Sequence, residues 1–404
     1  MKIAFLSHTA MGGSFVVGSH HLATSLAARG HEVQHVSAPV TPAHVFNLGD
    51  EFVRARLGRW WRGGETLAGV RDVVPFSPLP WPLARLHPAL MRAHSRAILA
   101  APLRGTGSLR LAQADHLIVD EPRFLGIALS RHSQATLTYR ATDLYAAMRG
   151  DPRIADAERA LCRHAAAIVA TSENIAVHLR ALSGRQVQVI ANGVDFAHFS
   201  RLPGPGTADE AARASRAVYV GAFDARFCRA ALRNAALAHP ARSFLLAGPG
   251  AARVTGELGL RNVLALGAVP YETLPALLQS CAVGLLPFSP ADANAGRSPM
   301  KLFEYAAAGL TVAATHAFRP GGVSLPTLCR ATSPDDFAQA VGAAFEQAAD
   351  AARIATARDI ARAQDWHAKA AELLQLVQQA RAESPLPRPG AVDMRLLPVR
   401  NSWN

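Results

Sequence analysis

A lysine and a glutamate stand three residues apart in the segment RSPMKLFEYAAAG, residues 297–309, among apolar and small residues. A serine followed by a proline is typical of a helix start, so Ser298 predicts a helix with Lys301 in its first turn. Glu304 then lies one turn further along the same face. A lysine near a helix N-terminus favours a phosphate, and a carboxylate beside it can accept hydrogen bonds from the two hydroxyls of a ribose. The segment therefore predicts a site for a nucleoside diphosphate.

An ordinary i,i+3 ion pair on a solvated helix is the competing interpretation of these two residues. Their context favours a binding site, because a long loop of small residues, 287–299, follows a predicted strand and leads into the helix. Loops at strand ends commonly carry binding sites. Arg297 adds a second cation at the end of this loop.

A second candidate for chemistry is Asp143, which follows the predicted strand of residues 135–141. A carboxylate at the carboxyl end of a sheet strand can act as a general base on a bound substrate. The competing interpretation is that Asp143 caps the next helix, as aspartate often does. Asp120 and Glu121, in the segment LIVDEP, are rival carboxylates at another predicted strand end.

The elements that must position these residues alternate between short apolar runs and helical patterns. Such alternation predicts an α/β fold with parallel sheets covered on both faces. The pattern stops in a Pro/Gly-rich segment and then resumes, which indicates two doubly wound domains. We expect an N-terminal domain of residues 1–200, a linker of residues 201–216, a C-terminal domain of residues 217–382 and a tail of residues 383–404. Open α/β sheets bind ligands beyond the carboxyl ends of their strands, so two such domains predict a cleft.

Gly12 and Gly13 follow the first predicted strand and precede a helical pattern. The segment lacks the full glycine fingerprint of dinucleotide-binding loops, which argues against NAD. A tight strand-to-helix turn and a loop that lines the ligand site both remain open for these two glycines.

Composition narrows the possible partners. The chain has 404 residues, 50% of them apolar, and a net charge of +12, which indicates an anionic partner. Basic, aromatic segments at residues 51–64 and 81–104 are typical of helices at a membrane interface, although surface helices that pack on the first domain fit equally well. The candidate membrane-facing residues are Arg59, Trp60, Trp61 and Arg62. No nucleic-acid recognition motif accompanies the charge, so nucleic acid is not an expected partner.

The four cysteines are widely spaced, with neither a CxxC pair nor metal-ligand spacing, as expected of reduced thiols in a cytosolic protein. The apolar run at the N-terminus is too short for a signal peptide and reads as a first strand. No segment approaches the ~20 apolar residues of a spanning helix. We therefore expect a cytoplasmic protein that is not integral to a membrane.

Several segments of the chain resemble a known group of enzymes. RSPMKLFEYAAAGLTVA, VYVGAFD, LLAGPG and ANGVDFAHFS resemble motifs of the GT-B glycosyltransferases that use nucleotide sugars, and the resemblance covers nearly the whole chain. Within that group, YRATDLYAAM, NGVD and SPMKLFEY are most similar to the membrane-associated glucuronosyltransferase family of xanthan assembly. The resemblance implies two Rossmann-like domains, a nucleotide-sugar donor on the C-terminal domain and a lipid-linked acceptor on the N-terminal domain.

The resemblance also implies roles for individual residues. Asp143 would be the catalytic base, Lys301 would contact the donor phosphates and Glu304 the ribose. Their predicted positions after strands, rather than the resemblance, make Gly12, Gly13 and Glu121 candidates for the acceptor or cleft loops. The donor-binding residues would be Ser298, Met300, Lys301, Glu304, Arg297, Gly221 and Phe223. The chain departs from the xanthan family in having Ser298-Pro299 where that family has Ser-Ser, Glu304 where it has Gln, and Ala268 where it has Glu, which leaves the donor sugar open.

The expected reaction is the transfer of a sugar from a nucleotide-diphosphate donor, which we expect to be UDP-linked, to a lipid-linked or polysaccharide acceptor. The position eight residues before Glu304 is Gly296 rather than a second Glu, which favours an inverting enzyme, and no Asp-x-Asp triplet predicts a metal site. We expect no cofactor and a peripheral position on an anionic membrane surface. The alternatives are a retaining GT-B enzyme with a small soluble acceptor and a non-catalytic protein that binds nucleotide sugars.

Overall fold

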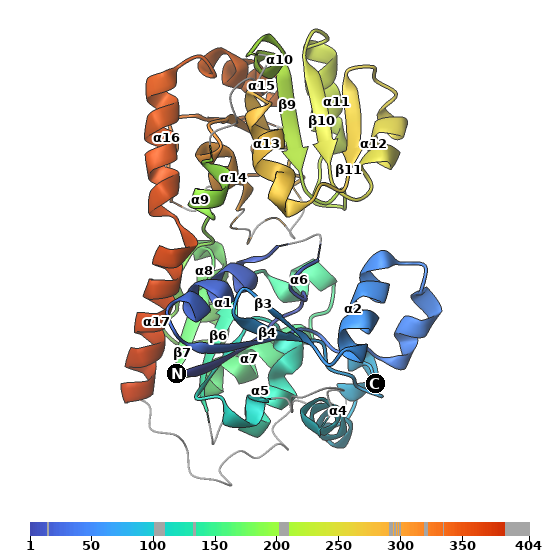
Figure 1. The fold of residues 1–404 in the computed structure, drawn as a ribbon, viewed down its shortest axis with the longest axis vertical. Coiled ribbons are helices and arrows are strands. Elements are labelled where there is room, and N and C mark those ends of the chain that lie inside the picture. Colours follow the sequence, from blue (N-terminus) through green and yellow to red (C-terminus); the bar gives the residue numbers. More distant parts are fainter. Residues whose placement is uncertain are drawn as a thin grey trace. The chain divides into compact units, whose positions relative to one another are not determined.

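The computed structural model describes residues 1–13, 16–100, 110–131, 135–201, 210–290, 294, 296, 298, 300–318, 322–333 and 335–383. The chain forms two compact units (Figure 1). Unit 1 comprises residues 1–190 together with the chain from residue 370 onward, and unit 2 comprises residues 191–369. This division differs from the predicted one, because residues 191–200 pack with unit 2 and the end of the last helix packs with unit 1.

Unit 1 is an α/β unit around one eight-stranded sheet in the described part of the chain. Its strands are β1 (Lys2–Leu6), β2 (Glu32–Val36), β3 (Glu65–Leu67), β4 (Val70–Val73), β5 (His116–Val119), β6 (Thr136–Ala141), β7 (Ala167–Ala170) and β8 (Gln188–Val189). Its α-helices are α1 (Gly18–Ala28), α2 (Glu51–Trp61), α3 (Trp81–Ala84), α4 (Pro88–Ala100), α5 (Leu125–Arg131), α6 (Tyr145–Arg149), α7 (Ile154–His164), α8 (Glu173–Ser183) and the end of α17 (Trp366–Glu383). Short 3₁₀ turns are η1 (Pro42–Asn47), η2 (Arg110–Gln113) and η3 (Pro122–Phe124).

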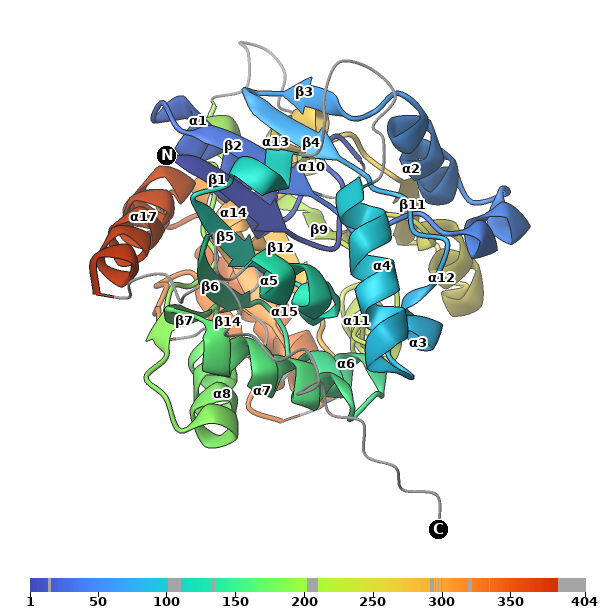
Figure 2. The same ribbon diagram turned by 90° about the horizontal axis from the view of Figure 1, so that it is seen from below.

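The strands of unit 1 run in the order β3-β4-β2-β1-β5-β6-β7-β8, and Figure 2 shows this row of strands. All neighbours are parallel except β3, which pairs antiparallel with β4 at the edge. Ile3 of β1 pairs with Val33 on one side and His116 on the other, so β1 lies in the middle of the sheet. The predicted parallel sheet is therefore confirmed, with one antiparallel edge strand that the sequence did not indicate.

Unit 2 contains a six-stranded sheet in the order β11-β10-β9-β12-β13-β14, with parallel neighbours. Its strands are β9 (Arg216–Val220), β10 (Ser243–Ala247), β11 (Val263–Gly267), β12 (Val283–Leu286), β13 (Thr311–Ala314) and β14 (Leu328–Arg330). Its helices are α9 (Phe196–Phe199), α10 (Glu210–Ala214), α11 (Arg229–Ala238), α12 (Ala251–Leu258), η4 (Tyr271–Thr273), α13 (Leu274–Gln279), α14 (Lys301–Ala307), α15 (Phe337–Gln347), α16 (Ala351–Ala363) and the start of α17.

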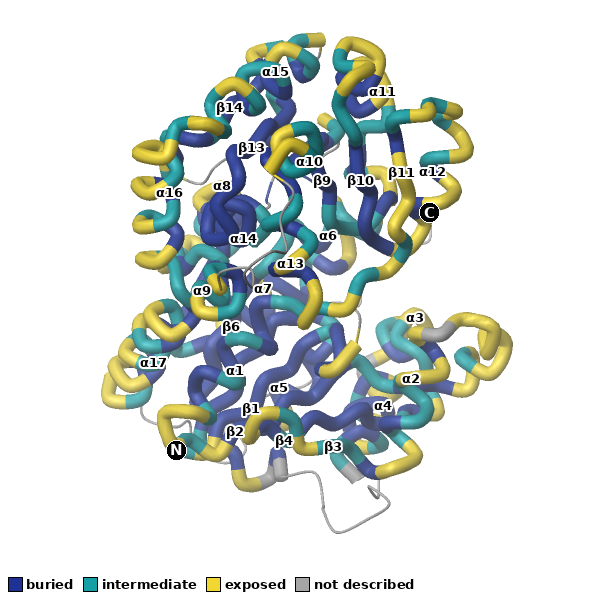
Figure 3. Tube along the Cα trace, turned by 45° about the horizontal axis from the view of Figure 1, so that its top comes forward, coloured by how far each residue is buried: buried dark blue, intermediate teal, exposed yellow. Residues whose placement is uncertain are grey.

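The central strands of each sheet are buried on both faces, and Figure 3 shows them as mostly buried traces between more exposed helices, whereas the edge strands β3, β8 and β11 have exposed positions. Strands β5, β7, β12 and β13 are buried at every position, as parallel strands between helical layers should be. Helix α8 illustrates how local sequence sets the helix ends. The Ser172 hydroxyl accepts a hydrogen bond from the Ile175 amide at 3.3 Å, and Gly184 ends the helix in the left-handed conformation.

The predicted linker and tail lie largely outside the described residues. Residues 202–209 and 384–404 are not described, whereas residues 210–214 form α10 and β9 begins at Arg216. All four cysteines are free thiols, in agreement with the prediction.

Candidate active site

Lys301 and Glu304 form a close ion pair at the start of α14, the helix that follows β12 in unit 2. The Lys301 ammonium donates to the Glu304 carboxylate at 2.6 Å. Glu304 is only 3% exposed, whereas the Lys301 side chain is 25% exposed. The pair is thus not the solvated surface pair of the competing interpretation, because its carboxylate is buried and one cation reaches solvent beside it.

The start of α14 differs from the prediction. The helix begins at Lys301 with Met300 as its N-cap, so Lys301 is the first helical residue rather than the third. Ser298 instead bonds to Asn192: its hydroxyl accepts the Asn192 amide N–H at 3.1 Å, and its carbonyl accepts the Asn192 side chain at 2.7 Å. Ser298 therefore fixes the loop before α14 to the NGVD segment. Arg297, like the proline after Ser298, lies outside the described residues.

Gly221 lies at the carboxyl end of β9, next to the end of β10. A side chain on Gly248, which has φ +143°, would lie 2.0 Å from the Gly221 carbonyl oxygen, so only glycine fits there. Phe223 is 5% exposed and packs against Tyr219 and Phe227 at ring distances of 5.2 and 5.0 Å. The Phe223 side chain therefore belongs to the core, which leaves the glycine backbone as the accessible feature of this edge.

Asp143 lies two residues beyond β6, at the carboxyl edge of the unit 1 sheet, and its side chain is half-buried. Helix α6 has Leu144 as its N-cap, with no side-chain capping bond among the described residues. The Thr142 hydroxyl donates to the Asp143 carboxylate at 3.4 Å and also bonds to the Tyr145 hydroxyl at 2.7 Å. The N-cap of α6 is therefore Leu144 rather than Asp143, and the Asp143 carboxylate stays a candidate base.

The rival carboxylates, Asp120 and Glu121, are both buried. Asp120 accepts from Arg140 at 2.7 Å, and burial raises its pKa to about 6 despite the arginine charge. Glu121 is gripped by Arg123 and Arg149; burial opposes its ionisation, but the two arginines lower its pKa to about 2. A carboxylate with so low a pKa is a poor proton acceptor near neutral pH. Glu121 is thus a fixed anion and not a substitute base.

The Gly12 turn rests on a chain of buried polar groups. Gly12 has φ +67°, and a side chain there would lie 3.2 Å from the Arg59 guanidinium. Arg59 donates to Asp72 at 2.6 Å, and the other Asp72 oxygen bonds to His35 at 2.8 Å. Burial opposes the ionisation of Asp72, but His35 and Arg59 hold its pKa below the ordinary value, with the Met11 amide as a further donor. The turn that carries Gly12 and Gly13 is therefore held by β4 and α2.

This chain of contacts corrects one predicted membrane-facing residue. Arg59 is 8% exposed and points into unit 1, where it pairs with Asp72 and, at 3.0 Å, with Glu65. Trp60 is half-buried and stacks on Phe76 at 5.3 Å. Both residues hold α2 against the sheet.

The opposite side of α2 faces solvent. Trp61 is 56% exposed, and the Arg62 side chain is 60% exposed. Exposed large apolar residues gather in the same part of unit 1, on and around η1, α2, α3 and α4: Val45, Phe46, Leu48, Phe52, Leu83, Leu86 and Leu90. Residues 42–104 contain nine arginines and four acidic residues. We define these seven residues with Trp61 as the apolar surface of unit 1.

Sequence reasoning missed Asn192, Arg123 and Arg149. Arg123 lies two residues after Glu121, and Arg149 lies six residues after Asp143. In the sequence neither arginine stands out, because arginine is common throughout the chain. Only the fold brings both to one carboxylate. Among the described residues, no group of three or more His, Cys, Asp or Glu side chains is arranged to hold a metal ion. No helix in that part of the chain combines the length and hydropathy needed to span a bilayer.

Comparison with protein families gives two matches. Residues 5–171 match the N-terminal domain model of the glucuronosyltransferase GumK, and residues 224–377 match a glycosyl transferase-like model. The chain is also 27% identical over 228 residues to a putative teichuronic acid biosynthesis glycosyltransferase, TuaH, of Bacillus subtilis. That match covers 53% of this chain and 57% of the relative, so the chain spans little more than half the length of TuaH.

Solved structures with a similar fold have low sequence identity to this chain. Sucrose-phosphate synthase from Thermosynechococcus elongatus has a TM-score of 0.70 at 18% identity and covers 95% of this chain and 100% of its own. Anabaena HepE, solved with UDP and glucose, has a TM-score of 0.63 at 16% identity, and the match covers 94% of this chain and 100% of HepE. WaaG, a glycosyltransferase involved in lipopolysaccharide biosynthesis, has a TM-score of 0.60 at 16% identity, and the match covers 93% of this chain and 99% of WaaG. The two sheets and these neighbours together show that the chain has the GT-B fold, and the two family matches show that it is related to glycosyltransferases, with its N-terminal domain related to that of GumK.

Proposed function

We propose that the protein transfers a sugar from a UDP-linked donor to a lipid-linked or polysaccharide acceptor, with inversion at the anomeric carbon and without a metal ion. The observation that carries the proposal is the Lys301–Glu304 pair, a buried carboxylate beside a partly exposed ammonium at the start of α14. The family matches, and the UDP-bound and UDP-sugar-bound structures among the neighbours, support a nucleotide-sugar donor.

In this proposal the donor exchanges the internal ion pair for contacts of its own. The Lys301 ammonium turns from Glu304 to the diphosphate, and Glu304 accepts hydrogen bonds from the ribose hydroxyls. Both charges then keep a partner, which matters because a buried carboxylate left alone is costly. Ser298 and Met300 fix the loop and the helix start, and Gly221 lets the backbone approach the donor.

Asp143 is the proposed base that removes the proton of the acceptor hydroxyl. It follows β6 at the carboxyl edge of unit 1, where open α/β sheets bind ligands. Its side chain is half-buried, and the N-cap of α6 is the next residue, Leu144. The departing diphosphate is neutralised by Lys301, so the reaction as proposed requires no metal.

We also propose that unit 1 binds an anionic membrane surface from the cytoplasmic side. The apolar surface of unit 1 and the arginine excess of residues 42–104 are the two features that a bilayer with acidic headgroups attracts. Trp61 and Arg62 are exposed on α2 and suit such contact, whereas Arg59 and Trp60 support the helix from inside. A membrane position suits an acceptor that is itself linked to a lipid.

The experiment that tests the function is a screen of the purified full chain against a panel of nucleotide sugars. Thermal shift identifies the donor, and UDP release with and without membrane lipid extract measures hydrolysis and transfer. Binding of a UDP sugar with acceptor-dependent UDP release supports the proposal. Binding with neither hydrolysis nor transfer would instead support a non-catalytic nucleotide-sugar-binding protein, and activity on a small soluble acceptor with retained configuration would support a retaining enzyme.

A further inference from the structure

Charged side chains line the carboxyl ends of four neighbouring strands of unit 1. The strands β2, β1, β5 and β6 are adjacent in the sheet. Five residues lie at these strand ends or on the elements that follow them: Arg56, which donates to the Ala38 and Pro39 carbonyls after β2, His8 after β1, Glu121 and Arg123 after β5, and Arg149 in α6 after β6. We call these five residues the arginine row; the mechanism proposed above uses none of its arginines.

Glu121 anchors two of these arginines. Arg149 Nη1 donates to Glu121 Oε1 at 2.9 Å while its Nη2 bonds to Oε2, and Arg123 Nη2 donates to Oε2 at 3.1 Å. The Glu121 carboxylate is fully buried, whereas the Arg149 and Arg123 side chains are 21% and 35% exposed. One buried carboxylate therefore fixes two guanidinium groups that still reach solvent.

The balance of charge and hydrogen-bond donors at this pair is incomplete. Two guanidinium groups carry about ten N–H donors, but one carboxylate offers about four acceptor positions. Arg56 adds a third positive charge, and its pKa is lowered to about 10 by burial and by the nearby charge of Arg123. Asp143, which acts electrostatically on Arg149, is a second negative charge nearby, whereas the Asp120 carboxylate is paired with Arg140 and is left out of this balance. Three positive charges and two negative ones give this cluster a net positive charge, which a bound oxyanion would balance.

We propose that Arg123 and Arg149, oriented by Glu121, bind the phosphate oxygens of a sugar acceptor that is joined to its lipid through a phosphate or diphosphate. This inference rests on the proposed function and supplies the chemical class of its acceptor. Guanidinium groups bind phosphate through two parallel hydrogen bonds, and a pair that a buried carboxylate already holds loses little freedom on binding. His8 adds a neutral donor or acceptor, since its Nδ1 has no hydrogen-bond partner among the described residues.

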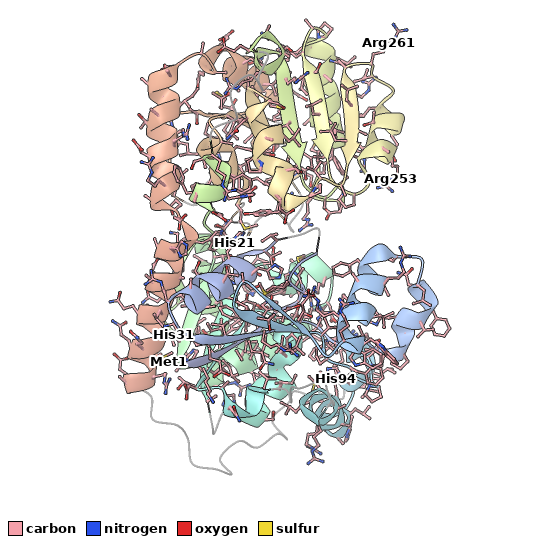
Figure 4. All side chains as sticks on the ribbon, in the orientation of Figure 1. Met1, His21, His31, His94, Arg253 and Arg261 are labelled. Carbon is pink, nitrogen blue, oxygen red and sulfur yellow. The ribbon has the colours of Figure 1, made fainter. Side chains whose placement is uncertain are left out.

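The position of Arg56 favours a phosphate next to a lipid over the carboxylate of a soluble sugar. Arg56 lies on α2, whose outer side contributes Phe52 and Trp61 to the apolar surface of unit 1. The arginine row is thus continuous with the surface proposed to contact the bilayer. By contrast, Arg253 of unit 2, labelled in Figure 4, shares the Glu257 carboxylate with Arg229, but that carboxylate is 47% exposed.

The test uses inorganic pyrophosphate as the probe and the full chain saturated with UDP, so that the donor site is occupied. Titration calorimetry should show pyrophosphate binding to the wild type and about tenfold weaker binding to Arg123→Gln. Glu121→Gln should bind pyrophosphate more tightly than the wild type, because loss of the internal anion raises the net positive charge at the two guanidinium groups. We expect this gain to exceed the loss of orientation, since the amide oxygen still accepts a hydrogen bond from them. Arg159→Gln, which removes an exposed arginine paired with Asp156 on α7, is the matched control and should bind like the wild type.

A purely structural role for the pair predicts the opposite sign for Glu121→Gln, so weaker binding by that folded variant would overturn the inference. If Glu121→Gln does not fold, Arg123→Lys is tested in its place. We expect its affinity for pyrophosphate to lie between those of the wild type and Arg123→Gln. An affinity equal to that of the wild type would refute recognition of the phosphate by paired hydrogen bonds. Binding of glucuronate without pyrophosphate would assign the row to a sugar carboxylate instead.

A second arm separates the acceptor phosphate from bulk phospholipid. Arg123→Gln should float with phosphatidylglycerol vesicles as well as the wild type does. Lost flotation with unchanged pyrophosphate affinity would show that the row binds headgroups, against the proposal. UDP affinity is measured in every variant, so a failure of UDP binding, which concerns the proposed function, is seen separately from a failure of pyrophosphate binding.

Discussion

Replacing Asp143 by asparagine separates the proposed base from every structural role of that position. The substitution keeps size and hydrogen-bonding reach but removes the ability to take a proton. The structure predicts little effect on folding, because the side chain is half-buried, the N-cap of α6 is Leu144, and the Thr142 hydroxyl that donates to Asp143 can equally bond to an amide oxygen. We expect the free energy of unfolding to change by no more than about 0.5 kcal/mol.

The expected effect on catalysis is much larger. A positioned general base contributes at least about a hundredfold to rate, which corresponds to about 2.7 kcal/mol of activation free energy. The assay is acceptor-dependent UDP release, measured with donor affinity and urea unfolding on the same samples. Asp156→Asn is the matched control, since it makes the same chemical change at an exposed site of unit 1. If Asp143→Asn keeps more than a tenth of the wild-type rate, Asp143 is not the base.

Four further predictions follow from the same geometry. Lys301→Ala should weaken UDP binding about tenfold or more, and Glu304→Gln should weaken UDP more than pyrophosphate, since only UDP has a ribose; equal losses for both ligands would contradict the ribose role. Activity should persist in excess chelator, and activity that magnesium restores would reveal a metal site. Replacing Trp61 and Arg62 by alanine should reduce flotation with anionic vesicles about fivefold or more, whereas Arg59→Ala should mainly lower stability; a wild type that does not float refutes membrane binding. The pKa of Glu121 is about 2, below its ordinary value, so its ionisation stabilises the fold above about pH 5, and this contribution is lost as the pH falls toward 2. Between pH 5 and pH 2, the free energy of unfolding should therefore fall less for Glu121→Gln than for the wild type. Urea denaturation over a pH series measures both, and equal losses would contradict the prediction.

The sequence by itself determined the fold class and indicated two candidate places for chemistry. Apolar strand patterns are local, so the alternation that predicts α/β domains survives without knowledge of neighbours. Lys301 and Glu304 lie three residues apart on one helix, and the structure keeps them together because that spacing is a property of the helix itself. Asp143 could be placed at a strand end for the same reason.

Tertiary structure decided what surrounds those residues. Ser298 reads locally as a helix cap, but Asn192, more than a hundred residues away, takes its hydroxyl. Arg59 and Arg62 look alike in a basic, aromatic segment, yet Asp72 of β4 draws one inward while the other stays in solvent. Glu121 reads as a spare base until α6 brings Arg149 against it. Charges are paired by whichever element packs beside them, and no local pattern encodes that neighbour.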